Sequence, residues 1–415
     1  MQAGDAPNIV LIVADDLGYA DLGVHGCKDI VTPNIDSIAN DGVRFTSGYV
    51  TAPVCAPSRA GFLTGRWQDR FGFEDNPLPG SKWGLPLERK TIAERLKPEG
   101  YATGIFGKWH QGEAPEYLPT NRGFDEFFGF LSGMHSYFHA DDPQWGKIYR
   151  GTEPASLDKY LTRAIADECV SFIDRHKDKP FFLYAAFNAP HIPGEVPEGY
   201  LTRIPEGITD PVRRTYLAMV RALDDGVGSI LESLRKNGLD QNTLVIFFSD
   251  NGGPIMKEAA ANGASNKPLR GGKAELWEGG IRVPFFMRWT GRIPAGRVLD
   301  EPVISLDVLP SVLALAGVPS DSTLDGVNIL PWAEGKASAP DRQPFFWKFY
   351  NQIVVREGGL KFIGQDYGRK SELYDLKNDI SETTDLAPGN PEKAAALKAR
   401  FEEWNRANGT PLHTP

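Results

Sequence analysis

The sequence predicts an α/β protein: a large, mostly parallel sheet flanked by helices on both faces, followed by a smaller C-terminal antiparallel sheet with a helix. Two observations carry this prediction. Apolar runs typical of fully buried strands alternate with amphipathic helical segments. After residue 330 the sequence pattern changes to short strand-like segments separated by Gly- or Pro-rich turns. We therefore expect a main domain at residues 1–330 and a small α+β subdomain at residues 331–415.

The expected strands are continuous apolar runs rich in β-branched and aromatic residues. They cover residues 8–14, 101–106, 181–187 and 244–248. Between them, Thr91 and Glu94 form a capping-box pattern that opens a helix. Apolar residues also recur at helical spacing from about 158 to 176 and from about 210 to 236. Because strands alternate with helices, the sheet should be largely parallel and covered on both faces.

The last quarter of the chain predicts a different arrangement. Its short strand candidates cover residues 345–349, 353–356, 360–363 and 373–376. Glycine or charged turns separate them, which favours a small antiparallel sheet. Apolar residues spaced around Ala394, Leu397 and Phe401 indicate a final helix.

Composition excludes several classes of protein. The 415 residues carry a net charge of −9, whereas binding nucleic acid needs a surplus of Lys and Arg on one face, so we expect no nucleic-acid partner. No run of about 18 apolar residues could span a bilayer, so we expect no transmembrane segment. The first residues lack the pattern of a signal peptide. We expect a periplasmic or secreted protein whose signal peptide has been removed, with a cytoplasmic protein as the alternative.

Residues that are charged or can bind a metal ion follow four of the buried strands. Asp15 and Asp16 end the first, Lys108 and His110 the second, His191 the third, and Asp250 and Asn251 the fourth. In parallel sheets, ligands bind beyond the carboxyl ends of the strands. Loop polarity would explain any one of these pairs, but together they predict a single site.

The residue types at that site point to a hard metal ion and a bound oxyanion. Asp15, Asp16, Asp250 and Asn251 offer only oxygen donors, which select Ca²⁺ or Mg²⁺ over zinc. Lysines and histidines add cationic and proton-transferring groups. Lys273 follows Gly271 and Gly272 in a turn suited to presenting a side chain to an anion. These features do not separate a sulfate ester from a phosphate ester.

The three cysteines form no disulfide framework. A bridge between Cys27 and Cys169 is one alternative, but we expect two buried free thiols. Cys55 stands apart, because Pro57 or Ser58 can open a short helix that places position 55 at its positive end. From the residues alone, Cys55 is either a thiolate nucleophile of low pKa or a buried structural thiol.

The segment Cys55-Ala56-Pro57-Ser58-Arg59, followed by Leu63-Thr64-Gly65-Arg66, resembles the signature of the formylglycine-dependent sulfatases, whose fold is that of the alkaline-phosphatase superfamily. Two further family-like segments follow in order, at residues 107–112 and 272–284. The resemblance runs from Asn8 to about Ala387. The segment at residues 65–74 is most similar to bacterial polysaccharide sulfatases.

The resemblance implies a role for each matching residue. Asp15, Asp16, Asp250 and Asn251 would bind Ca²⁺, with Mg²⁺ as the alternative. Cys55, oxidised to formylglycine by a formylglycine-generating enzyme or an anaerobic maturase, would be the nucleophile and would also touch the metal. Arg59 and Lys108 would stabilise its hydrate, and His110 would be the base that helps to expel sulfate. His191 and Lys273 would hold the substrate sulfate, with His191 protonating the leaving oxygen.

The expected activity is therefore hydrolysis of a sulfate ester, on a sulfated saccharide. The alternatives are an arylsulfatase of small substrates, or a phosphate or phosphonate ester hydrolase of the same superfamily, which usually needs a second metal or a Ser/Thr nucleophile. Ser132, His135 and Arg270 are candidate substrate-binding residues. Aromatic side chains that could stack on sugars, or else cover the core, are Trp67, Phe71, Phe73, Trp83, Trp145 and Trp347.

Overall fold

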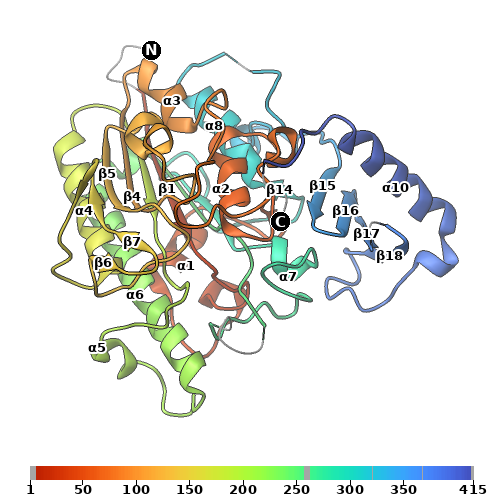
Figure 1. The fold of residues 1–415 in the computed structure, drawn as a ribbon, viewed down its shortest axis with the longest axis horizontal. Coiled ribbons are helices and arrows are strands. Elements are labelled where there is room, and N and C mark those ends of the chain that lie inside the picture. The colour runs from red at the N-terminus through yellow and green to blue at the C-terminus, as the bar shows by residue number, and fades with distance from the viewer. Residues whose placement is uncertain (1–5, 257–261, 320, 367, 413–415) are drawn as a thin grey trace.

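The computed structural model describes residues 6–256, 262–319, 321–366 and 368–412 (Figure 1). Residues 1–5, which entered the sequence-based expectation about a signal peptide, lie outside the described residues. Within the described ranges, no helix is both long enough and apolar enough to cross a membrane.

A mixed sheet forms the centre of the main domain. In the described part of the chain it has ten strands in the order β13-β2-β12-β11-β1-β10-β4-β5-β8-β9. Strands β11, β1, β10, β4 and β5 run parallel, and β12 and β8 join them antiparallel. The bounds are β1 Asn8–Ala14, β2 Val43–Phe45, β4 Ala102–Lys108, β5 Glu126–Phe130, β8 Tyr149–Arg150, β9 Glu153–Pro154, β10 Phe181–Ala186, β11 Thr243–Ser249, β12 Phe285–Arg288 and β13 Arg297–Leu299.

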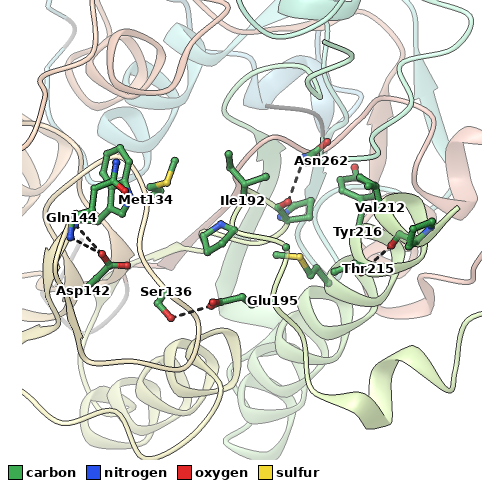
Figure 2. A pocket seen from close by; sticks show the side chains of 16 residues that line it. Met134, Ser136, Asp142, Gln144, Ile192, Glu195, Val212, Thr215, Tyr216 and Asn262 are labelled. Carbon is green, nitrogen blue, oxygen red and sulfur yellow. Dashed lines mark hydrogen bonds between the residues drawn. The ribbon is translucent and has the colours of Figure 1, made fainter. Parts of the chain in front are cut away.

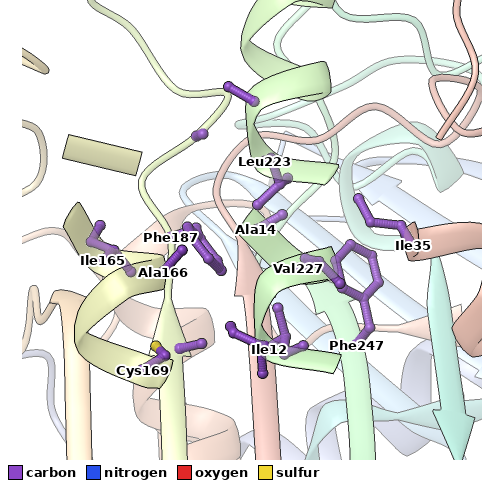
Figure 3. Packing of buried hydrophobic residues seen from close by; sticks show 14 of the residues in the cluster. Ile12, Ala14, Ile35, Ile165, Ala166, Cys169, Phe187, Leu223, Val227 and Phe247 are labelled. Atoms are coloured by element: carbon purple, nitrogen blue, oxygen red, sulfur yellow. The ribbon is translucent and has the colours of Figure 1, made fainter. Parts of the chain in front are cut away.

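Helices cover both faces of this sheet, as the alternation of strands and helices predicted. One face carries α1 (Pro33–Asn40), α4 (Leu161–His176) and α6 (Pro211–Lys236), and the other carries α2 (Cys55–Thr64), α3 (Ile92–Leu96) and α8 (Val308–Leu315). Side chains of β1 alternate between the two cores, because successive residues of a strand point to opposite faces. Figure 3 shows Ile12 and Ala14 of β1 packed with residues from α4 and α6.

The expected strands and helices of the main domain are present within a few residues. The capping box is confirmed: the Thr91 side chain accepts a hydrogen bond from Glu94 N, and the Glu94 side chain accepts one from Thr91 N. Strand β5 was not expected, because it is short and its aromatic run leads into a glycine-rich loop. Shorter elements are β3 (Gly48–Tyr49), β14 (Val303–Ile304), β6 (Asp141–Asp142), β7 (Gly146–Lys147), α5 (Glu198–Leu201) and α7 (Glu278–Ile281).

The C-terminal part forms an antiparallel sheet in the order β15-β16-β17-β18 with α10 packed on it, as expected (Figure 1). The bounds are β15 Phe345–Phe349, β16 Gln352–Glu357, β17 Leu360–Gln365, β18 Lys370–Asp375 and α10 Pro391–Asn405. Trp347 ties this sheet to the main body, because its indole donates to Val50 O at 2.7 Å and lies against Trp67. The expected boundary at residue 330 falls at the start of α9 (Leu330–Ala333), which packs in the main core, and that boundary stays a prediction.

Candidate active site

The sheet order brings the four predicted strand ends together. Strands β11, β1, β10 and β4 are neighbours, so the residues that follow them meet at one edge. Asp15 and Asp16 follow β1, Lys108 ends β4, His110 follows it closely, and Asp250 and Asn251 follow β11. His191 lies in the loop after β10. The convergence expected from the sequence is thus present in the structure.

An acidic cluster lies at the centre of this edge. Asp15, Asp16 and Asp250 are buried, and Asp250 Oδ1 accepts a hydrogen bond from Asp16 N at 3.3 Å. Asp16 has a φ of 64°, a left-handed conformation that sharply turns the chain after β1. Asn251 donates its amide to Asp16 Oδ1 at 2.7 Å. Its own carbonyl oxygen, Oδ1, is buried and has no hydrogen-bond partner among the described residues.

Cationic side chains surround the acids. Lys108 Nζ lies 2.5 Å from Asp15 Oδ2, and the Arg59 guanidinium donates to Asp250 Oδ2 at 3.0 Å. Burial by itself would raise the pKa of Asp15, but Lys108 and the other cations hold that pKa well below its usual range. Burial, together with the charge of Asp15, raises the pKa of Asp250 to about 6. The protonation state of each carboxylate in this cluster therefore depends on the charges of its neighbours.

Cys55 stands at the first position of α2, so the helix begins two to three residues earlier than the expected opening at Pro57 or Ser58. Its Sγ lies 3.4 Å from Asp15 Oδ1. Burial and the neighbouring Asp15 charge raise the pKa of the Cys55 thiol to about 12. Burial and the negative charge of Asp15 thus favour the protonated thiol over a low-pKa thiolate where no cation is bound. The choice between the two alternatives for Cys55 stays a prediction.

Arg59, one turn further along α2, is fully buried and reaches back to the same cluster. Besides Asp250, it donates from Nη1 to Tyr184 Oη at 2.9 Å. Tyr184 belongs to β10 and was not singled out from the sequence, because a tyrosine in a buried strand looks like any core aromatic. Asn76 was missed for a similar reason: its side-chain oxygen accepts from Ala56 N at 2.9 Å and so caps α2.

The two histidines follow neighbouring strands, His110 after β4 and His191 after β10. His191 Nε2 lies 3.5 Å from Asp16 Oδ2, and its Nδ1 lies 2.6 Å from Ile192 O. Burial, then the charge of Lys273, lowers the pKa of His191 to about 4. Burial, then Lys108 and Arg59, holds the pKa of His110 well below its usual range. The Nδ1 atom of His110 is buried without a hydrogen-bond partner among the described residues.

Lys273 completes the group from the glycine turn between β11 and α7. Its Nζ lies 2.8 Å from Asp16 Oδ1 and 2.9 Å from Asp16 Oδ2. Its backbone N donates to Gly253 O, which ties the turn to the loop after β11. A Cβ built on Gly272 would come within 2.4 Å of that same oxygen, so the close approach of the two segments requires glycine.

Asp15, Asp16, Cys55 and His191 each offer a ligand atom within 4.8 Å of the others. The orphaned carbonyl of Asn251 and the carboxylate of Asp250 add oxygen donors at the same place. A donor set dominated by oxygen fits a hard divalent cation. Of the residues predicted to hold a metal, Asp15, Asp16 and Cys55 belong to the group that shares this distance limit. His191, which was not predicted as a ligand, also belongs to it, and Asp250 and Asn251 lie beside it.

The three candidate substrate-binding residues are engaged in contacts with the protein. Ser132 Oγ donates to Trp145 O at 2.6 Å. Both ring nitrogens of the fully buried His135 lie beside backbone carbonyls, those of Ser136 and Gly146. Arg270 stacks on Trp277. These contacts give the three side chains structural roles, and substrate binding by them stays a prediction.

Most of the aromatic residues that were candidates for stacking on sugars instead cover the core, which was the other alternative. The buried ones are Trp67, Phe71, Phe73 and Trp347. Trp83 is partly buried against Phe73. Trp145 is partly exposed and lines a cavity beside the candidate active site. Cys27 and Cys169 are free thiols, as expected, but only Cys169 is buried, whereas Cys27 is partly exposed.

Comparisons with known proteins agree with this geometry. The chain matches the family model described as Sulfatase over residues 7–318, and the model described as N-sulphoglucosamine sulphohydrolase, C-terminal, over residues 272–406. It is 36% identical to arylsulfatase A of Homo sapiens, over 94% of this chain and 86% of that protein. It is also 36% identical to N-acetylgalactosamine-6-sulfatase of Canis lupus familiaris, over 86% of this chain and 72% of that protein.

Among solved structures, Ps i-CgsB in complex with k-i-k-neocarrahexaose superposes with a TM-score of 0.93 at 37% identity. That superposition covers 98% of this chain and 94% of the other. The phosphonate monoester hydrolase of Agrobacterium radiobacter superposes with a TM-score of 0.71 at 22% identity, covering 97% of this chain and 95% of that chain, a likeness of fold alone.

Proposed function

The chain belongs to the sulfatase family, and we propose that it removes O-sulfate groups from a sulfated carbohydrate, using formylglycine made from Cys55 and a bound Ca²⁺. One observation carries the proposal. A buried residue 55 at a helix start lies against an acidic cluster, Asp15 among it, that Arg59 and Lys108 flank. A nucleophile, a metal site and anion-binding cations are thus within contact of one another.

The metal would be held by Asp15, Asp16, Asp250 and Asn251, with Mg²⁺ as the alternative to Ca²⁺. Two observations support this set. Asn251 Oδ1 has no hydrogen-bond partner among the described residues, and a bound cation would satisfy it. The pKa of Asp250 is raised by burial and by the Asp15 charge, and a bound cation would offset that repulsion between the carboxylates. Bound there, the ion would supply positive charge against the negative charge that develops on oxygen during sulfate transfer.

The unmodified thiol is a poor nucleophile here, because its pKa of about 12 keeps it protonated at neutral pH. This supports oxidation of Cys55 by a formylglycine-generating enzyme or an anaerobic maturase, which would supply a hydrated aldehyde as the attacking group. Arg59 and Lys108 reach the same Asp15 carboxylate that Cys55 contacts, so they are placed to bind the oxygens of that group.

The two histidines suit opposite proton transfers. The low pKa of His110 leaves its imidazole neutral at neutral pH, the form that accepts a proton. His191 must instead carry a proton on Nε2 to protonate a leaving oxygen. Its pKa of about 4 reflects burial and the neighbouring Lys273, and an anionic sulfate beside Lys273 would raise it. Lys273 and His191 both contact Asp16, so they lie on the same side of the cluster.

A cavity of about 740 Å³ supports a saccharide substrate (Figure 2). Its walls include Pro190 and Ile192, which flank His191, and Met134, whose neighbour Gly133 packs against the His110 ring. Trp145 offers an aromatic surface on which a sugar can stack, and polar groups in the wall can bind hydroxyls. The volume suits a ligand of several sugar rings better than an aryl sulfate.

The test is sulfate release from a panel of substrates by protein whose Cys55 has been converted. The panel contains sulfated mono- and oligosaccharides, p-nitrophenyl sulfate and p-nitrophenyl phosphate. We expect kcat/KM to be highest on a sulfated saccharide, with the position of desulfation read by NMR, and phosphate release to be negligible. Preference for the aryl sulfate over every saccharide would refute the carbohydrate assignment, and preference for the phosphate would refute sulfate specificity.

A further inference from the structure

A second large cavity, of about 900 Å³, lies where the C-terminal sheet meets the main body. Its lining includes Tyr19, the segments beside β3, α7 and β14, the segment leading into β15, the β16–β17 turn and the residues that follow β18. It shares no lining residue with the cavity beside His191. The cationic side chains in its wall include Arg282, Arg342 and Arg356.

Arg356 is the unusual member of this wall. It is only 8% exposed, yet no hydrogen bond or ion pair joins its guanidinium to another described residue. Its Nε is fully buried without an acceptor. The nearby Glu278 carboxylate is already taken, by Lys361 on one oxygen and by Tyr49 and Arg282 on the other. A buried cationic donor without an acceptor is costly, so an acceptor from outside the chain would stabilise it.

The other two arginines are held so that part of each guanidinium stays available. Arg282 donates from Nε to Thr46 O at 2.8 Å and from Nη1 to Glu278, whereas its Nη2 has no hydrogen-bond partner among the described residues. Arg342 forms two bonds with Asp307 through Nη1 and Nη2, at 3.0 and 2.8 Å, and these leave its Nε free.

Aromatic rings orient all three guanidinium groups. Arg282 lies over Tyr19, Arg342 over Phe345, and Arg356 over Tyr49, with ring distances of 5.9, 5.5 and 5.1 Å. Such cation–π contacts restrain the guanidinium without using its N–H groups as hydrogen-bond donors.

Acidic residues also line this cavity, but they lie at its rim or are paired. Asp300 and Glu301 are exposed, and Asp300 accepts a hydrogen bond from Thr46 Oγ1 at 2.7 Å. Glu357 forms an ion pair with Arg400. Behind the wall, the buried Glu278 carboxylate is already bound by Arg282 and Lys361, so the guanidinium of Arg356 is the cation at which an anion would be bound.

We propose that this cavity binds a tetrahedral oxyanion, a sulfate group, with Arg356 as the principal ligand. Several N–H groups in fixed orientation match the several oxygens of such an anion. The sulfate group has two sources, free inorganic sulfate or a sulfate ester on a saccharide that extends across the C-terminal sheet. The proposal does not depend on the chemistry at Cys55.

The direct test uses crystals of the full chain soaked in selenate, a tetrahedral oxyanion with a strong anomalous signal. We expect an anomalous peak within hydrogen-bond distance of the Arg356 guanidinium, separate from any peak near Lys273. The proposal is overturned if a soak that fills the catalytic site leaves this cavity without a peak.

The solution test compares thermal unfolding in sodium sulfate and in sodium chloride at equal ionic strength. Sulfate stabilises proteins in general, so the informative quantity is the saturable part of the shift that a variant loses. We expect Arg356→Met to lose that part and Arg356→Lys to keep some of it. Arg292→Met is the control, since Arg292 also stacks on a ring but lies outside the cavity. Equal sulfate-dependent shifts in wild type and Arg356→Met would overturn the proposal.

A final arm separates the two sources. A sulfated disaccharide and its desulfated form are titrated against wild type and Arg356→Met. Protection of wild type by the sulfated sugar at a lower concentration than inorganic sulfate identifies a saccharide site, whereas the reverse order identifies a site for free sulfate. Activity on p-nitrophenyl sulfate at saturating substrate should be the same in wild type and Arg356→Met, because Arg356 does not contact the catalytic cluster.

Discussion

Replacing Lys361 with Met should destabilise the protein strongly and disturb the turn that carries Lys273. Lys361 is fully buried in β17, and its Nζ lies 2.9 Å from Glu278 Oε1 and 2.8 Å from Glu382 Oε1. Burial would raise the pKa of Glu278, but Lys361 and Arg282 hold it low. Methionine preserves volume yet leaves two carboxylates in the interior without their shared cation.

Removing one partner of a buried ion pair typically costs about 3–5 kcal/mol. An unfolding entropy of about 2.1 cal/mol/K per residue, over 415 residues, makes 1 kcal/mol equal to about 1.1 °C in Tm. The expected loss is therefore about 3–6 °C. The matched control is Lys398→Met on α10, because Lys398 is partly exposed and lies 3.9 Å from Glu402, a surface pair worth less than about 1 kcal/mol.

The loss should depend on pH. Burial and the charge of Glu278 raise the pKa of Glu382 to about 7. A raised folded-state pKa means that the protonated carboxyl is the form compatible with the fold, so its stability contribution is present at acid pH and is lost as pH rises toward 7. Lys361→Met should thus lose less at pH 5 than at pH 8.

The assay is calorimetric unfolding of wild type, Lys361→Met and Lys398→Met at both pH values, together with KM for a sulfated saccharide. Glu278 begins α7, just after the Lys273 turn, so we expect KM to rise in Lys361→Met. A Tm loss no larger than that of the Lys398 control, or equal losses at pH 5 and pH 8, would refute the electrostatic reasoning.

Three other predictions concern the reaction. Excess chelator should abolish activity, Ca²⁺ or Mg²⁺ should restore it, and Asp250→Ala should lose both metal, by elemental assay, and turnover; full activity in chelator would contradict the metal assignment. In protein made by a host that contains the maturation enzyme, mass spectrometry should find the peptide containing Cys55 lighter than its thiol form. Wild-type turnover by unmodified Cys55→Ser would exclude residue 55 as the formylglycine nucleophile. His191→Ala should lower kcat/KM by about 10²–10⁴-fold on sugar sulfates and far less on activated aryl sulfates, since a good leaving group needs no proton, whereas His110→Ala should slow both and trap a sulfated residue 55. Equal losses on both substrates for His191→Ala would make it a sulfate-binding residue only.

The sequence predicted the central strands well, because burial on both faces leaves a continuous apolar run that few other structures produce. It also predicted the capping box at Thr91, since that signal is local. It missed β5, whose short aromatic run reads as the start of a loop, and it placed the start of α2 late. Helix α2 begins at Cys55, and its first turn is capped by Asn76, which lies 20 residues beyond Ala56 and accepts a hydrogen bond from Ala56 N; a partner so distant in the sequence leaves no local pattern.

The order of residues along the chain is enough to place oxygen donors, cations and histidines after the buried strands, and hence at one edge of the sheet. The charge states and partners of these side chains depend on the folded arrangement. The thiol of Cys55 is held protonated by burial beside Asp15, and His135 is taken up by backbone carbonyls. The folded arrangement also leaves Arg356 without an acceptor among the described residues. Covalent neighbours set secondary structure, whereas desolvation and Coulomb interaction depend on distances that only the folded chain defines.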